Sequence, residues 1–286
     1  MITRAKTKAT IVSVVSATGY ASVPEAVREL RDRNGFLFAV AAINLSLFVG
    51  MAAIAPFDGR SVLGLNPWFK PMKFALSIAI YTATVGWVVG YLRLNERIER
   101  RITWGIGTAM LVEIAIISFQ GARAVESHFN DSTLFDMALA GVMLAAILLN
   151  TALVAYLLVR FWRTEPSLAP AYCWGIRLGF AVFVFASLEG FAMIGNFGHA
   201  VGVPDGGPGL PFVNWSTRAG DLRVAHFVGL HGLQVIPLVG FVVASLAERQ
   251  RISRSVALVW AFAVGYGGVA LILFLAALAG QPLIRL

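Results

Sequence analysis

The stretch "GDLRVAHFVGLHGLQVIPL", residues 220–238, decides the class of fold. It is apolar over nearly the whole length that a membrane-spanning helix requires, roughly 20 residues. It nevertheless carries five polar side chains, which are Asp221, Arg223, His226, His231 and Gln234. Polar side chains inside a membrane are costly, so this helix is expected to turn them toward protein or a wet cavity rather than toward lipid.

The composition of the whole chain indicates an integral membrane protein. The 286 residues are 58% hydrophobic and only 13% charged, whereas a soluble domain carries about 25% charged residues. The mean hydropathy is +0.77. Cys173 is the single cysteine, which excludes an internal disulfide framework and a cysteine-rich metal site. The net charge of +8 does not indicate a nucleic-acid partner, because the basic residues lie in short segments between apolar runs.

Seven apolar runs reach spanning length and predict an all-α membrane domain. They are residues 35–57, 71–93, 103–122, 134–160, 171–198, 223–246 and 255–280. Such long continuous runs exclude the alternating strands of a membrane barrel. We therefore divide the chain into an N-terminal segment, 1–34, and a seven-helix transmembrane domain, 35–286. Ser22 and Glu25 have the spacing of a capping box, which predicts a short amphipathic helix in the first segment.

Basic residues predict the orientation in the cell membrane, since cytoplasmic loops carry an excess of Lys and Arg. The N-terminal segment is basic, and so are "RLNERIERR" (93–101), "RFWRTEPS" (160–167) and "AERQRISRS" (247–255). Seven spans place all four segments on one side of the membrane. The sequence thus predicts a multi-pass inner-membrane (plasma-membrane) protein with a cytoplasmic N-terminus and an extracytoplasmic C-terminus.

Histidines and other polar residues then gather toward the extracytoplasmic face. All four histidines of the chain fall there, namely His128, His199, His226 and His231. At about 100° per residue, Arg223, Gln234 and His231 lie within about 140° of His226 on one helix. The helix is therefore predicted to line a polar cavity. Three glycines on it would let neighbouring helices approach closely, and they are Gly229, Gly232 and Gly240.

A metal-dependent hydrolase is the function that this gathering of histidines favours. Three imidazoles can hold Zn²⁺ or another transition metal with one open position, and the predicted ligands are His128, His199 and His226. A bound water would be activated by the metal, with Glu126 or Asp221 as general base. His231 and Gln234 would support the ligands.

The substrate of this hydrolysis is predicted to be a lipid or another amphipathic, membrane-embedded molecule. Its anionic head group would be held by four basic side chains, which are Lys70, Lys73, Arg123 and Arg223. Lys70 and Lys73 have a second interpretation, since lysines beside Trp68 can simply extend toward the membrane surface.

Other functions are compatible with the same residues. Buried histidines can hydrogen-bond between helices, and two facing histidines can bind a b-type haem for electron transfer. Glu113 and Glu189, expected near the middle of the membrane, suit a transporter. The chain could also be a homo-oligomer or a non-enzymatic subunit of a membrane complex.

Two resemblances can be read from these motifs. The chain resembles uncharacterised bacterial polytopic membrane proteins with a similar "GDLR…HF.GLH..Q..P" stretch, which implies no activity and no site residue. "ESHFND" (126–131) and "HFVGLH" (226–231) loosely resemble the seven-span zinc hydrolases that include alkaline ceramidases and adiponectin receptors. Those enzymes carry H-x-x-x-H in their last span, whereas His226 and His231 lie five apart in the sixth run. This likeness is therefore an analogy of chemistry.

Overall fold

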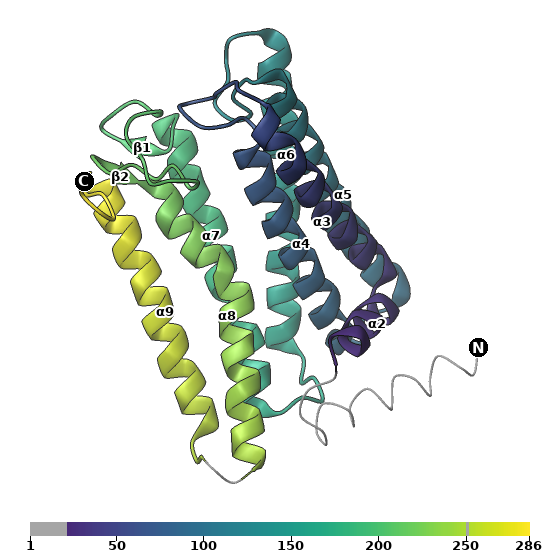
Figure 1. Cartoon of the computed structure of the whole chain (residues 1–286). Helices are drawn as coiled ribbons and strands as arrows, with labels where there is room; N and C mark the ends of the chain where they lie inside the picture. Colours follow the sequence, from purple (N-terminus) through teal and green to yellow (C-terminus); the bar gives the residue numbers. More distant parts are fainter. Residues whose placement is uncertain (1–21, 250–251) are drawn as a thin grey trace.

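The computed structural model describes residues 22–249 and 252–286, which form a bundle of seven long helices (Figure 1). The long helices are α3 (Gly35–Ile54), α4 (Phe69–Val89), α5 (Glu96–Arg123), α6 (Leu134–Arg163), α7 (Pro170–Asn196), α8 (Leu222–Glu248) and α9 (Ser255–Leu278). Short 3₁₀ turns extend α3 and α4, and they are η1 (Ala55–Phe57) and η2 (Gly90–Leu92). All seven are long and apolar enough to cross a membrane. The prediction of an all-α protein with seven spans is confirmed.

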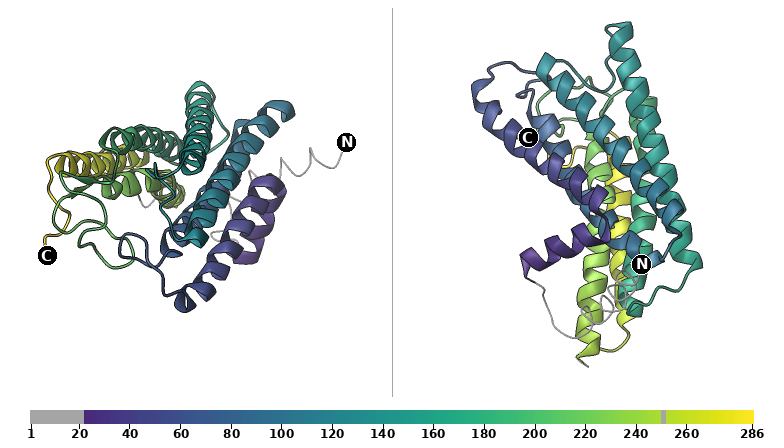
Figure 2. Two further views of the ribbon diagram at one scale, coloured as in Figure 1. Left: turned by 90° about the horizontal axis from the view of Figure 1, so that it is seen from above. Right: turned by 90° about the vertical axis from the view of Figure 1, so that its right-hand side faces the viewer.

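The helices form two groups, with α3 to α6 on one side and α7 to α9 on the other (Figures 1 and 2). The most extensive contact joins α7 to α8, followed by those of α3 with α4 and of α8 with α9. By comparison, α4 and α8 touch at few points. The C-terminal residues and the helix α2 (Val23–Arg33) lie at opposite ends of the bundle, as an odd number of spans requires.

Glycines allow the close packing of α7 against α8. A Cβ atom on Gly179 would lie 2.8 Å from Cδ of Pro237 and 3.0 Å from the carbonyl oxygen of Gly232. A Cβ on Gly240 would lie 2.8 Å from the carbonyl oxygen of Ala171. The two distances of 2.8 Å are shorter than real Cβ contacts, so glycine is the residue that fits at both positions without a shift of its neighbours. Small residues at such interfaces are what van der Waals packing between membrane helices requires.

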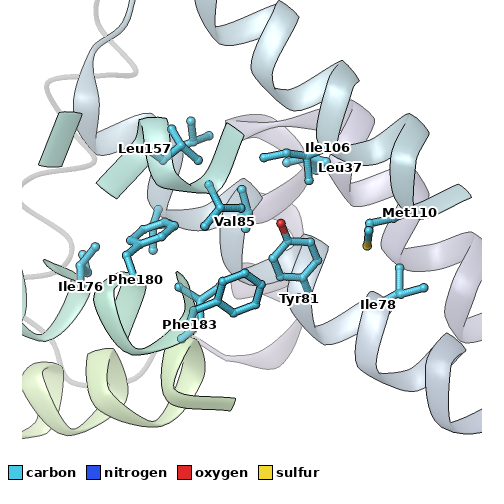
Figure 3. Close-up of a cluster of buried hydrophobic side chains, with 14 of the residues drawn as sticks. Leu37, Ile78, Tyr81, Val85, Ile106, Met110, Leu157, Ile176, Phe180 and Phe183 are labelled. Carbon is cyan, nitrogen blue, oxygen red and sulfur yellow. The ribbon is translucent and has the colours of Figure 1, made fainter. Parts of the chain in front are cut away.

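An aromatic and aliphatic core joins the two groups of helices (Figure 3). The ring of Tyr81 on α4 stacks on the ring of Phe183 on α7, with centroids 5.3 Å apart. The Tyr81 hydroxyl donates a hydrogen bond of 2.7 Å to Oδ1 of Asn150 on α6. A buried hydroxyl is thereby satisfied, and three helices are fixed at one level.

The two ends of the bundle differ in chemistry. We call the polar end the one formed by residues 58–68, 124–133, 197–221 and 279–286. There, β1 (Ala200–Val201) and β2 (Gly220–Asp221) pair as a small antiparallel ribbon. The basic end is formed by α2 and residues 93–95, 164–169 and 252–254. The predicted gathering of the histidines lies toward the polar end. Which end faces the cytoplasm stays a prediction.

The predicted amphipathic helix of the first segment corresponds to α2. The backbone N–H of Ser22 donates a hydrogen bond of 2.9 Å to Oε2 of Glu25, which is part of the expected capping box. Arg33 at its other end donates to the carbonyl oxygen of Trp87 over 2.9 Å and so attaches α2 to α4. The rest of the predicted segment, residues 1–21, lies outside the described residues.

Candidate functional site

A cavity of about 360 Å³ opens at the polar end. Its wall comes from three segments that are far apart in the sequence, with Leu63 from the first, Glu126 and Phe129 from the second, and Asn196 and Asp205 from the third. Two carboxylates, those of Glu126 and Asp205, therefore line one pocket. Concave sites with a few converging polar groups are the usual place for binding and chemistry.

Asp205 holds the loop that leads from α7 into the ribbon. Its carboxylate accepts hydrogen bonds from the backbone N–H groups of His199 and Ala200, at 3.0 and 2.8 Å. Its Oδ2 atom is also 2.5 Å from Nδ1 of His199. Burial opposes ionisation, but the hydrogen bonds from His199 and these backbone groups hold the pKa of Asp205 well below its usual range. Asp205 is thus ionised, and both of its carboxylate oxygens accept hydrogen bonds that hold this loop.

His199 is the neutral partner of that anchor. Burial lowers its pKa to about 4, against the opposing hydrogen bond with Asp205 and with help from the positive charges of Lys70 and Arg223. The edge of the Phe129 ring packs against the imidazole, with centroids 5.2 Å apart. The imidazole is therefore held in place by a carboxylate on one side and an aromatic ring on the other.

Glu126 is the uncommitted carboxylate of the pocket. Among the described residues its side chain makes no hydrogen bond and no ion pair, and only its backbone carbonyl accepts, from Asn130. Burial raises the pKa of Glu126, with a further contribution from the charge of Asp205 and an opposing one from Lys70. A carboxyl group whose pKa is raised while a neighbouring carboxyl stays ionised has the character of a proton-transferring residue.

Lys70 is an uncommitted cation within electrostatic range of Glu126. It lies in the first turn of α4 and, within the described part of the chain, no hydrogen bond or ion pair engages its ammonium group. Its positive charge influences the pKa of Glu126, of His128 and of His199. A partly buried ammonium without a partner is suited to bind an anion.

Lys73 and Arg223, two other predicted anion-binding residues, are engaged in holding the loop 197–221. Nζ of Lys73 donates to the carbonyl oxygens of Phe212 and Val213, at 3.0 and 3.3 Å. Arg223 forms a two-pronged pair with Asp221, at 2.9 and 2.6 Å, and also donates to the carbonyl oxygen of Asn214.

Asp221, predicted as a general base, is the buried anchor of this arrangement. Its side chain is fully buried, accepts from the backbone N–H of Ser216 at 2.8 Å, and caps α8 by accepting from the N–H of Arg223 at 3.0 Å. Asp221 and Arg223 therefore pair with each other, and neither lines the pocket.

Arg123, the fourth predicted anion-binding residue, is occupied at the end of α5. Its guanidinium donates to Oδ1 of Asp136 and to Oε1 of Gln120, both at 2.5 Å. It also lies over the rings of Phe119 and Phe135. Of the four predicted anion-binding residues, only Lys70 is left with an unengaged head group.

The predicted metal ligands do not come together. His128 contacts Ser127 at 3.0 Å and Glu113 at 3.4 Å, whereas His226 contacts the carbonyl oxygen of Ala186 at 2.9 Å. His199 is paired with Asp205. Among residues 22–249 and 252–286, no group of three or more His, Cys, Asp or Glu side chains could hold a metal ion. Each imidazole belongs to a different local contact, so the described structure does not support the predicted three-histidine ligand set.

The two residues predicted to support those ligands have other contacts. His231 packs against the ring of Phe227, with centroids 4.4 Å apart. Gln234 donates to Oγ1 of Thr84 at 3.4 Å, one of the few contacts between α8 and α4. Both residues contact protein, as expected from their positions around the helix. Neither contact involves His128 or His199.

Asp205 lines the pocket but was not among the residues predicted from sequence. Asp205 lies in "VPDGGPG" (203–209), and a Pro-Asp-Gly run signals a tight turn in which the Asp side chain bonds nearby backbone groups. That signal could have indicated a local anchor. It could not have indicated that the turn lies beside residue 126, because the loops meet only through the packing of separate helices.

Comparison with known proteins gives one informative relative. The chain is 25% identical over 249 residues to a protein from Halothiobacillus neapolitanus named as the probable peptidoglycan glycosyltransferase FtsW. The match covers 79% of this chain and 59% of the relative, so the chain spans less than two thirds of that protein's length. No family model matches the chain, and no solved structure matches it.

The predicted metal-dependent hydrolysis of a lipid is contradicted by this relative, whose name describes a glycosyltransferase. The haem-based and transport alternatives find no support in it either. The seven spans and the likeness to that membrane protein do place the chain in the cell membrane as a multi-pass protein.

Proposed function

We propose that the chain carries out glycosyl transfer on a membrane-anchored donor at the polar-end pocket. The observation that carries the proposal is the uncommitted carboxylate of Glu126 in the pocket wall, on which the positive charge of the uncommitted Lys70 acts. The likeness to a probable peptidoglycan glycosyltransferase supports this class of reaction.

Glu126 has the properties of the general base in such a transfer. The acceptor hydroxyl loses its proton to the Glu126 carboxylate while its oxygen forms the new bond to the sugar carbon of the donor. Asp205 is less suited, because its oxygens already accept from His199 and Ala200. The two carboxylates thus have different tasks, one in proton transfer and one in shaping the pocket wall.

Lys70 has the properties of the group that stabilises the departing anion. As the bond between the sugar and its leaving group breaks, the electron pair stays on the leaving group, and a nearby ammonium stabilises that charge. A leaving group of the phosphate type fits this requirement. Lys73 and Arg223 add positive potential while their head groups hold the loop in place.

Turnover by the full-length protein in proteoliposomes tests this proposal. The readout is the formation of polymer from a lipid-linked peptidoglycan precursor as donor and acceptor. Glu126→Gln is expected to lower the rate about 10²- to 10⁴-fold, the usual contribution of a general base. Lys70→Gln is expected to lower the rate by loss of charge stabilisation.

Two control substitutions remove the same charges from exposed positions at the polar end. Asp131→Asn and Arg218→Gln change residues that are exposed and lie outside the pocket, and both should leave the rate unchanged. An inactive wild-type protein, or a Glu126→Gln variant as fast as Asp131→Asn, would overturn the proposal.

Orientation, partners and cofactors complete the proposal. The polar end is assigned to the extracytoplasmic side, on the basis of the arginines at the other end. The partner is an amphipathic, lipid-linked molecule within the bilayer. Zn²⁺, another transition metal and haem b stay predictions about a cofactor, which metal analysis and an absorption spectrum of the purified protein would test.

A further inference from the structure

A second cavity lies on the outer surface of the bundle, between α5 and α6. It measures about 430 Å³ and is lined by Trp104, Gly105, Thr108 and Ala109 from α5 and by Ala146 and Leu149 from α6, among others. Trp104 and Leu149 are 54% and 50% exposed, so the cavity opens sideways, toward where the acyl chains of the bilayer would lie. Its lining is almost wholly apolar, apart from Thr108.

Arginines continue both walls of this cavity toward the basic end. On α5, Arg97 and Arg101 precede Trp104 and Thr108 at spacings of seven, which places them on the same helix face. On α6, Arg160 follows Leu149 by eleven residues and shares its face in the same way.

The two arginine-bearing faces lie at the same level. A Cβ on Gly105 would be 2.6 Å from Cδ1 of Leu153, which fixes the register of the antiparallel pair. Four residues before Gly105 is Arg101, which is therefore level with Leu157. One further turn brings Arg97 to the level of Phe161, the neighbour of Arg160.

Arg160 also has an unsatisfied donor at this point. Its Nε–H group is buried and, within the described residues, has no hydrogen-bond partner. A buried donor without a partner is costly and calls for a ligand. The acids Glu96 and Glu99 lie about 140° and 160° away from Arg101 around α5, at about 100° per residue. Positive charge thus prevails on the face that continues the cavity.

We propose that the α5–α6 cavity binds one anionic phospholipid, with an acyl chain against the apolar lining and the phosphate against Arg97, Arg101 and Arg160. Basic pockets between membrane helices recognise anionic head groups in this way. A second copy of the chain is a poorer occupant, because a symmetric contact would bring two sets of these arginines together. The proposal does not depend on the activity assigned to the polar end.

Lipid retention by the full-length protein tests the site. The purified protein is exchanged into mixed micelles that contain equal amounts of phosphatidylglycerol and phosphatidylcholine, and bound lipids are counted by native mass spectrometry. Wild type should retain one phosphatidylglycerol in preference to phosphatidylcholine. Arg160→Gln should weaken that retention about five-fold, the effect of about 1 kcal/mol per basic side chain near an anionic lipid.

Two more variants separate the head-group contact from the apolar contact. Ala146→Phe fills the cavity and should lower the retention of the preferred lipid while the arginines remain. Arg249→Gln removes an exposed arginine at the C-terminal end of α8, outside the residues that line the cavity, and it should retain lipid as wild type does. Equal retention by Arg160→Gln and Arg249→Gln would overturn the proposal. So would a dimer that Ala146→Phe dissociates.

Discussion

The helices α7 and α8 are held together in two different ways along their length. In the bundle they meet through glycines, where Gly179 faces Pro237 and Gly240 faces Ala171 without any charged group between them. At the polar end they are joined by the loop 197–221, which is held by charged and hydrogen-bonded side chains. We call the glycine-packed part of α7 and α8 the shaft, and the loop 197–221 with the side chains that hold it the cap. The shaft is apolar, whereas the cap is polar.

This contrast separates the features of a membrane protein that follow from local sequence from those that do not. Packing through glycines follows from residue type and spacing on one helix, and Gly232 and Gly240 were identified from sequence as close-approach positions. The cap depends on distant partners, since Lys73 of α4 donates to Phe212 and Asn214 donates to Leu63. Substitutions in the shaft and the cap should accordingly have separable effects.

The largest effect on stability is expected from Asp221→Asn in the cap. The change removes the charge that pairs with Arg223 and weakens an acceptor for the N–H of Ser216. Leaving one partner of a buried pair uncompensated costs about 3–5 kcal/mol, and because Arg223 keeps 27% exposure we expect the lower end of that range. The thermal unfolding midpoint should fall and protease should cut the loop 197–221. An unchanged midpoint would contradict the anchoring role of Asp221.

A somewhat smaller effect is expected from Gly179→Ala in the shaft. The new methyl group would lie 2.8 Å from Pro237 and 3.0 Å from the backbone oxygen of Gly232, and overpacking of this kind costs about 1–3 kcal/mol. The matched control is Gly141→Ala on α6, where nothing lies within 4 Å of the added Cβ. The control should be neutral or slightly stabilising, because alanine favours helix. Equal midpoints for the two variants would show that the shaft tolerates a methyl group.

The smallest effect is expected on the pH dependence of stability, and it comes from His199 in the cap. The pKa of His199 falls from 6.5 to about 4 on folding, so between these values the unfolded chain binds more protons than the folded one. The stability that His199 contributes is therefore complete above about pH 6.5 and is lost as the pH falls toward about 4. The unfolding midpoint of wild type should drop more between about pH 7.5 and about pH 5 than that of His199→Gln. Parallel curves for the two proteins would argue against a neutral, buried His199.

The membrane fold was predictable from sequence, whereas the site was predictable only in part. The seven apolar runs matched the seven helices because length and hydropathy are local properties. Glu126 and Lys70 were predicted as functional residues, but Asp205 was not, since it reaches the pocket only after three loops have met.

The predicted metal site is unsupported for a related reason. The imidazoles of His128, His199 and His226 lie toward one end of the bundle, as predicted, but each is engaged locally, by Glu113, Asp205 and Ala186 respectively. Sequence places residues at a depth in the membrane. It does not say which helix faces which, and a ligand set requires both.

Cysteine labelling in intact cells tests most directly whether the pocket, with Glu126 in its wall, is reached from outside the cell. Ser61→Cys places an exposed thiol at the polar end, and Ser253→Cys places one at the basic end. The native Cys173 is buried and serves as the background. With a membrane-impermeant maleimide, we predict labelling of position 61 in intact cells and of position 253 only after permeabilisation. Labelling of position 253 but not of position 61 in intact cells would contradict the account.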